Sequence, residues 1–136
     1  MTDRIEKALI VADPWISLIL DDKKDWEMRS RKTTIRGNIG LIKKGSGLVC
    51  GVVKLVGCGD PLTPDEMLKQ FDRHKLPAHM IESGQVASWN TPWVLQDIRK
   101  LASPVRYTHK SGAVTWVNLD PEVSDQIHRQ MMAEGR

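Results

Sequence analysis

Three ionisable side chains, Lys24, Glu27 and Arg29, lie within one short stretch of the chain. The alternating pattern from Trp26 to Ser30 predicts a β-strand, in which Glu27 and Arg29 share one face. Lys24 precedes this strand, where a predicted helix ends, so its ammonium group can reach the same face. We therefore expect a lysine, a glutamate and an arginine to cluster in a shared cleft.

Such a cluster suits two kinds of functional site and also a structural role. In a binding site, Lys24 and Arg29 would contact phosphate groups. In a hydrolase acting on RNA or on a modified nucleoside, Lys24 would stabilise a developing anion or act as a base. Glu27 would then be the general acid or base, and Arg29 would orient the substrate. The structural interpretation is an ion pair of Glu27 with Lys24 or Arg29 at the mouth of a barrel.

Basic charge is concentrated around this cluster. The chain carries a net charge of +3, yet residues 23–44 hold eight basic and two acidic side chains. A clustered basic segment is typical of proteins that bind polyanions, so RNA or another nucleic acid, or a nucleoside, is the expected partner. Exposed aromatic rings such as Trp15 and Tyr107 could stack an unpaired base. The expected nucleic-acid contacts are Trp15, Lys23, Lys24, Arg29, Ser30, Arg31, Lys32, Arg36, Lys43, Tyr107 and His109.

Length and composition indicate one globular domain over residues 1–136. Apolar residues make up 40% of the chain and charged residues 27%, which is ordinary globular usage. No apolar run approaches the roughly 20 residues that cross a bilayer, and the N-terminal segment is unlike a signal peptide. We therefore expect a cytoplasmic protein that does not bind membranes.

The cysteines and histidines do not have the spacing of a metal site. Cys50 and Cys58 lie eight apart in one apolar run, so we expect core thiols without a mutual disulfide. His74 and His79 are five apart around Pro77, and we expect them to be solvated loop residues. No cofactor and no metal are expected.

The elements before the middle of the chain can be predicted from local patterns. Residues 6–12 form an apolar run that predicts a buried first strand. Asp13 is a favourable N-cap and Pro14 a favourable first helical residue, which predicts a helix over residues 14–22. Strands are expected at residues 37–43 and 48–56, with a tight turn between them because glycines occupy that connection.

Helices and strands alternate in the second half as well. Thr63 and Glu66 have the spacing of a capping box, which predicts a helix as far as about His74. Strand character resumes at residues 87–100. The remaining elements are expected to be a final hairpin of residues 104–109 and 113–119, which would place Tyr107 and His109 on one strand face, and a closing helix after Pro121. In that hairpin His109 could line the cleft or make a structural hydrogen bond.

Together these elements predict an α+β fold, a small β-barrel or strongly curved sheet of about six strands with three helices. An interaction domain that docks a protein partner is a third functional class, but no specific feature supports it. We expect a monomer or a weak dimer.

Part of this pattern resembles a known family. Pro14 and Trp15, a helix ending in basic residues, the Glu27-x-Arg29 strand and then Gly37 resemble the activating signal cointegrator homology (ASCH) domain of the PUA-like superfamily. The stretch over residues 107–119 resembles the last hairpin of that family. The resemblance covers about residues 8–119, and the helix expected at residues 121–135 lies outside it.

The resemblance implies a PUA-like β-barrel whose cleft, beside the first helix and the Glu-x-Arg strand, faces RNA or another nucleic acid. Some bacterial relatives hydrolyse the acetyl amide of acetylated cytidine, with a lysine at the position of Lys24 and a threonine at that of Glu27. Relatives with ribonuclease activity also exist. Glu27 removes the usual hydroxyl nucleophile, although Ser30, Thr33 and Thr34 lie nearby in the sequence.

Overall fold

The computed structural model describes residues 4–134 and places six strands in one sheet, in the order β2-β5-β4-β3-β1-β6. The strands are β1 (Lys7–Val11), β2 (Trp26–Arg29), β3 (Gly37–Lys43), β4 (Leu48–Cys58), β5 (Thr91–Arg106) and β6 (Trp116–Asn118). The helices are α1 (Trp15–Leu20), α2 (Pro64–Lys69), α3 (Phe71–His74), α4 (Ala78–Glu82) and α5 (Pro121–Glu134). The predicted α+β class and the six strands are confirmed.

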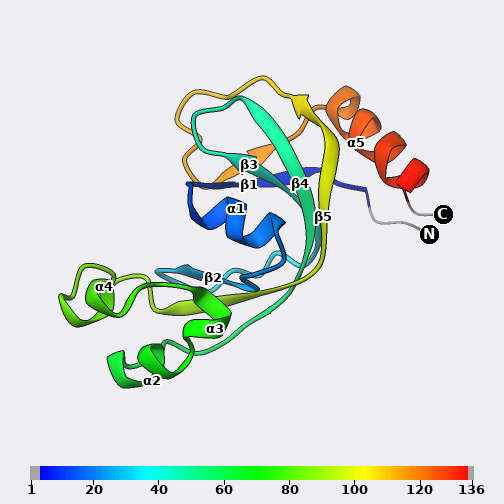
Figure 1. The fold of residues 1–136 in the computed structure, drawn as a ribbon. Helices are drawn as coiled ribbons and strands as arrows, with labels where there is room; N and C mark the ends of the chain where they lie inside the picture. The colour runs from blue at the N-terminus through cyan, green and yellow to red at the C-terminus, as the bar shows by residue number, and fades with distance from the viewer. Residues whose placement is uncertain (1–3, 135–136) are drawn as a thin grey trace.

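The sheet curls into a half-barrel around α1, as Figure 1 shows. Its two longest strands, β4 and β5, pair with three register shifts, and such bulges bend a sheet and increase its twist. The curl brings the edge strand β2 toward the end of β1 without pairing the two strands. We call the gap between β2 and residues 10–12 the seam.

Helix α1 fills the concave side of the sheet. Its residues Ile16 and Ile19 are buried in a core with the inner faces of β3, β4 and β5. A Cβ atom on Gly51 would lie 2.3 Å from Leu20 Cδ2, so glycine at this position lets the helix approach β4 closely. Helix α1 begins one residue later than predicted, with Pro14 at the N-cap position, but Asp13 still bonds to the first turn. Its Oδ1 accepts hydrogen bonds from the backbone N–H of Ser17 at 3.3 Å and from the Ser17 hydroxyl at 2.6 Å.

The segment between β4 and β5 differs from the prediction. The capping box of Thr63 and Glu66 is present, but the helix that it starts is interrupted at Gln70, so α2 and α3 are separate. A further short helix, α4, occupies the stretch around His79 that was expected to be irregular. The structure therefore has five helices among residues 4–134, not three.

His74 is the clearest error in this segment, because it is fully buried and not solvated. Its Nε2 lies 2.7 Å from the carbonyl oxygen of Met67, and its Nδ1 accepts a hydrogen bond from the backbone N–H of Leu76 at 2.9 Å. Burial is tolerated because both ring nitrogens have a backbone partner. The ring joins α2 to the segment after α3, whereas His79 is exposed as predicted.

The predicted final hairpin is wrong. Strand β5 continues to Arg106, where it pairs with Leu48 of β4, and β6 pairs antiparallel with β1. Tyr107 and His109 consequently lie in the connection after β5 and not in a strand. The strand at residues 116–118 was predicted correctly, but its partner was not. This strand pairs with the edge of β1 that β3 does not occupy.

Helix α5 closes the opposite end of the molecule from α2–α4 (Figure 1). Val123 and Ile127 are buried against an apolar core that includes Leu101 and Val105 of β5. Ser124 donates a hydrogen bond to the carbonyl oxygen of Ile5, which ties the helix to the segment before β1. Among residues 4–134, no helix is long and apolar enough to cross a membrane.

Candidate functional site: a pocket at the seam

A cavity of about 300 Å³ opens at the seam. Ile10 and Ala12 at the end of β1 form one side, and residues 27–29 of β2 form the other. Apolar side chains of Leu76, Met80 and Val86 close its lower end, where α4 approaches β2. The pocket therefore exists because the half-barrel does not close, and its walls come from five separate parts of the chain, namely residues 10–15, 24–29, 44, 76–89 and 114.

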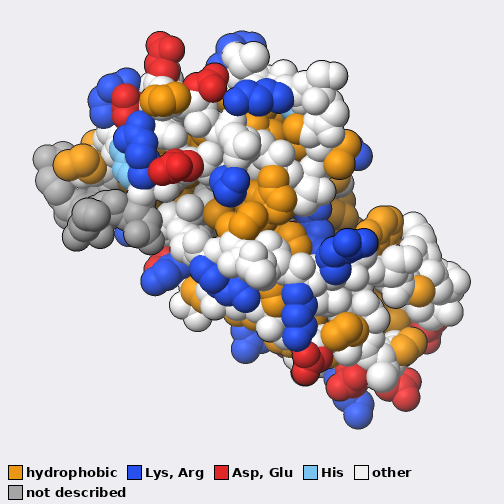
Figure 2. Space-filling view, turned by 180° about the vertical axis from the view of Figure 1, so that it is seen from behind, with side chains coloured by type: hydrophobic (Ala, Val, Ile, Leu, Met, Phe, Trp, Pro, Cys, Tyr) orange, Lys and Arg blue, Asp and Glu red, His pale blue; other side chains and the backbone are white. Residues whose placement is uncertain are grey.

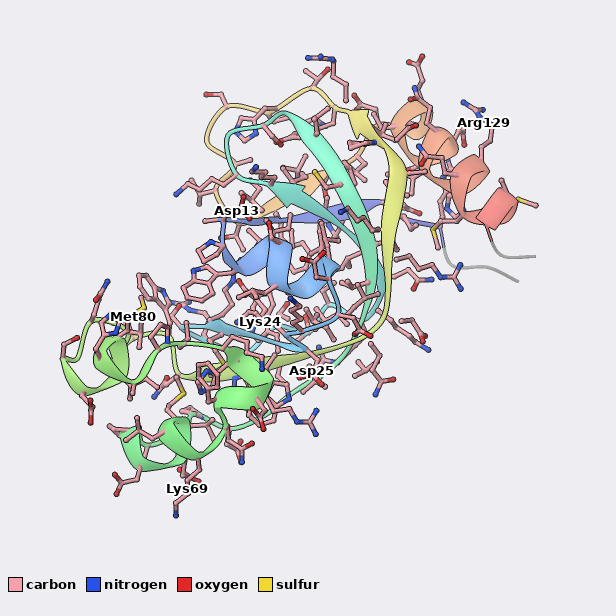
Figure 3. The ribbon with its side chains drawn as sticks, in the orientation of Figure 1. Asp13, Lys24, Asp25, Lys69, Met80 and Arg129 are labelled. Carbon is pink, nitrogen blue, oxygen red and sulfur yellow. The ribbon has the colours of Figure 1, made fainter. Side chains whose placement is uncertain are left out.

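Lys24 lies at the base of this pocket, between α1 and β2 (Figure 3). Only 1% of its side chain is exposed. Its Nζ donates a hydrogen bond to the carbonyl oxygen of His74 and lies 5.3 Å from the ring centroid of Trp15. The buried ammonium group is thus held by a carbonyl dipole and an aromatic face, both of which favour a cation.

Glu27 stands between two cations. Its Oε2 accepts a hydrogen bond from Arg29 Nε at 3.0 Å and forms an ion pair with Arg29 Nη2 at 2.9 Å. Its Oε1 lies 3.9 Å from Lys24 Nζ, and 8% of the side chain is exposed. The predicted Lys–Glu–Arg cluster is confirmed, and it carries a net positive charge.

Arg29 also bridges the seam. Its Nη2 donates to the carbonyl oxygen of Ile10 at 2.9 Å, so one guanidinium group links β2 to β1 where no strand pairing exists. The planar group lies 5.6 Å from the ring centroid of Trp93, which supports it from the concave side. Arg29 therefore fixes the width of the pocket and also contributes charge to it.

Burial explains the protonation of this site. Desolvation lowers the pKa of Lys24 from 10.5 to about 8; the carboxylate of Glu27 opposes that shift, and Arg29 adds to it. Lys24 remains mostly protonated at pH 7. Desolvation also lowers the pKa of His74, and the positive charge of Lys24 lowers it further. His74 is therefore neutral, as expected for a ring whose Nδ1 accepts a hydrogen bond.

Two tryptophans border the pocket in different ways. Trp15 is half-buried beneath Lys24, so it serves both as a wall and as part of the core. Trp89 stands at the rim with 50% of its surface exposed. The exposed ring is available to stack on a flat ligand that enters the pocket.

The structure separates the other predicted contacts from the pocket. Trp15, Lys24, Glu27 and Arg29 line it, whereas the remaining predicted residues lie elsewhere on the surface. Figure 2, seen from behind, shows Lys and Arg side chains across the middle of the molecule, with acidic side chains toward two ends. The predicted residues outside the pocket lining are Lys23, Ser30, Arg31, Lys32, Arg36, Lys43, Tyr107 and His109.

Several of these outer residues have local partners. Lys32 forms an ion pair with Asp60 at 2.7 Å, and Lys43 forms one with Asp13 at 3.1 Å. Tyr107 Oη lies 3.1 Å from Nδ1 of His109, so the structural hydrogen bond considered for His109 is present.

Sequence reasoning missed Lys44, Trp89 and Val114 as specific pocket residues. Lys44 follows the last residue of β3, and its backbone N–H donates a hydrogen bond to the carbonyl oxygen of Val11 at 3.0 Å, which places it beside the end of β1. Val114 comes from the misassigned hairpin. Among residues 4–134, no group of three or more His, Cys, Asp or Glu side chains is arranged to hold a metal ion.

Comparison with known proteins places this chain in a family. A profile of the ASCH domain matches residues 9–111, which is more than half of the chain. No curated protein sequence matches. Among solved structures, ASCH from Zymomonas mobilis is similar, with a TM-score of 0.70 and 14% identity over 93% of this chain and 96% of that one.

A mutant form of the same Zymomonas mobilis protein gives a TM-score of 0.69 at 14% identity, over 93% of this chain and 98% of that chain. A second mutant form gives 0.66 at 15% identity, over 95% and 98%. At these identities the likeness shows the fold alone. The match of the family profile over most of the chain shows more: this protein belongs to the ASCH domain family, within the PUA-like superfamily.

Proposed function

We propose that this ASCH domain binds single-stranded RNA and holds one unpaired base in the seam pocket. The observation that carries the proposal is the combination of aromatic rings and buried cations around one cavity. Trp15 and Trp89 offer faces for stacking, and Lys24 and Arg29 supply fixed positive charge beside them. Single-strand binding sites combine stacking surfaces with positive charge in this way.

Exposed basic side chains outside the pocket would contact the phosphates on either side of the bound base. Lys23, Arg31 and Arg36 are exposed and form no ion pair among the described residues. Lys32 and Lys43 are exposed as well, and their ion pairs at the surface are weak enough to exchange for a phosphate. Such contacts release counterions, so affinity should depend strongly on salt.

The pocket favours binding over the hydrolysis that we considered as the alternative. Among the described residues no Ser, Thr or Cys side chain lines it, and the nearby Ser30, Thr33 and Thr34 lie outside its walls. A protein hydroxyl is therefore not positioned beside Lys24 to attack a ligand.

The proposal is tested by titrating labelled single-stranded RNA and a duplex of the same sequence at several salt concentrations. We expect preference for the single strand and a logarithmic salt slope of roughly −0.7 for each phosphate contacted. Affinity that is equal for the two forms, or independent of salt, would overturn it. Analysing the same mixtures for cleaved RNA, with Lys24→Met as the control, tests hydrolysis directly.

A further inference from the structure

The two carboxylate oxygens of Glu27 have different surroundings. Oε2 accepts a hydrogen bond from Arg29 Nε and pairs with Arg29 Nη2 at 2.9 Å. Oε1 is 3.9 Å from Lys24 Nζ, which is too long for a hydrogen bond, and it has no hydrogen-bond partner among residues 4–134. Oε1 is also not among the fully buried, unpartnered polar atoms, so it remains accessible. One oxygen holds Arg29, and the other is free to accept a hydrogen bond from a ligand.

Lys24 provides a complementary donor. An ammonium group has three N–H bonds, and only the bond to the His74 carbonyl is within hydrogen-bonding distance among the described residues. The cavity therefore presents a hydrogen-bond donor and an acceptor side by side, on Lys24 Nζ and Glu27 Oε1, both of which belong to residues lining the pocket.

The charge of Glu27 excludes a phosphate at this position. A phosphate drawn to Lys24 would lie next to the carboxylate, and like charges at such short range in a poorly solvated site repel strongly. A neutral ligand with an acceptor next to an N–H avoids this repulsion and satisfies both protein groups. Every unpaired nucleobase carries such a pair on its Watson–Crick edge, and in a duplex that edge is already occupied.

The pocket walls fit a flat ring in this orientation. Trp15 supports Lys24 from one side, and Trp89 and Met28 add apolar surface along the cavity. A volume of about 300 Å³ is at the lower end for ligand pockets, which suits one base better than two.

We propose that Lys24 and Glu27 read the Watson–Crick edge of the bound base, with Lys24 donating to an acceptor and Glu27 Oε1 accepting from the adjacent N–H. This inference rests on the proposed RNA binding and adds what the pocket recognises. The site therefore selects bases whose edge is unpaired and unmodified.

Two isomeric RNAs test the inference without altering the protein. Oligouridine made of 5-methyluridine keeps the N3–H, whereas oligouridine made of N3-methyluridine loses it, and both carry one added methyl group per base. We expect the 5-methyl form to bind like unmodified oligouridine and the N3-methyl form to bind roughly tenfold or more weakly, the scale of a lost base contact.

The variant Glu27→Gln tests the same contact, between Glu27 Oε1 and the N–H of the base, by changing the protein. In the wild-type protein Arg29 donates a hydrogen bond to Oε2 of Glu27. The glutamine amide would therefore direct its oxygen toward Arg29 and its NH₂ group toward the cavity. We expect this variant to lose the discrimination between the two isomers, while a thermal melt checks that it folds.

The possible failures are distinguishable. If wild-type protein binds a mixed-sequence single strand but binds the two isomers equally, the reading of the base edge is overturned and RNA binding stands. If it binds no single-stranded RNA at all, the proposed function itself is overturned. Discrimination that persists in the Glu27→Gln variant would overturn the role of Glu27.

Discussion

The two ends of the curled sheet are built on opposite principles. Under α5, residues such as Leu101, Val105 and Ile127 form an apolar core, and no charged side chain among residues 4–134 is buried there. At the seam, Lys24 and Glu27 are almost as deeply buried, yet both are ionisable. An apolar side chain gains stability from burial, whereas a buried ion loses hydration that its partners only partly replace.

The seam is therefore not arranged for stability. The fold could close the gap between β1 and β2 with apolar residues, as it does under α5. It holds a cation with a lowered pKa beside an open cavity instead, and pKa values perturbed in this way are frequent at functional sites. We therefore expect substitutions under α5 to lower stability and leave RNA binding unchanged. Substitutions at the seam should weaken RNA binding with a smaller loss of stability.

The largest expected effect is on stability, at the α5 end. Ile127→Ala removes a fully buried side chain, and we expect it to lower the free energy of unfolding by about 2–5 kcal/mol. Denaturant titration measures this loss. Met132→Ala on the same helix is the control, because Met132 is 76% exposed and its change should stay within about 0.5 kcal/mol. RNA affinity of the folded variants should match wild type.

The next effect is at the seam, where Lys24→Met should abolish binding without the stability loss that Ile127→Ala causes. Because the folded pKa of Lys24 is below its unfolded value, the unfolded state binds more protons between pH 8 and 10.5, and wild-type stability rises there. The variant lacks this titration. We therefore expect wild type to gain about 2 kcal/mol relative to Lys24→Met between pH 7 and 10.

Denaturant titrations of both proteins across that pH range measure the difference. Lys69→Met on α2 is the matched control, since Lys69 is exposed and points away from the sheet (Figure 3). A stability difference between wild type and Lys24→Met that does not change with pH would mean that Lys24 is not desolvated in the folded state.

A smaller effect separates two aromatic rings of similar exposure. Trp89, at the pocket rim, is 50% exposed, and Phe71, on α3 and outside the pocket lining, is 46% exposed. Trp89→Ala should weaken RNA binding by roughly 1–3 kcal/mol, the contribution of one stacked base, while Phe71→Ala should not change it. Equal losses in the two variants, measured by fluorescence anisotropy, would contradict a specific stacking role.

The smallest effect concerns one lysine at the rim. Lys44→Gln should reduce the logarithmic salt slope of RNA binding by roughly 0.7, the loss of one phosphate contact, whereas Lys69→Gln should leave it unchanged. Affinity measured at four or five salt concentrations gives both slopes. An unchanged slope for Lys44→Gln would show that Lys44 does not contact a phosphate.

Local sequence patterns were sufficient for the cluster itself. The alternation around Glu27 and Arg29, and the helix end before Lys24, are short-range signals, and all three side chains meet as predicted. The capping box at Thr63 and the turn glycines Gly45 and Gly47, both with positive φ, are local signals of the same kind. Each depends on a few neighbouring residues.

The failures concern contacts between distant segments. The pattern of residues 116–118 indicated a strand but not that β1, more than 100 residues earlier, would pair with it. His74 is a local failure instead. Its two backbone partners, Met67 and Leu76, are seven and two residues away, and the predicted helix through this stretch breaks at Gln70. The pocket was not predictable as a cavity, since the seam results from the bulges that bend β4 and β5.

The most direct test of the central claim follows the indole N–H signals of the five tryptophans by nuclear magnetic resonance during titration with single-stranded RNA. We expect the signals of Trp15 and Trp89 to shift and those of Trp26 and Trp116, which do not line the pocket, to remain in place. Single substitutions assign the signals. Binding that shifts Trp26 or Trp116 while Trp15 and Trp89 stay unchanged would show that RNA does not enter the seam pocket.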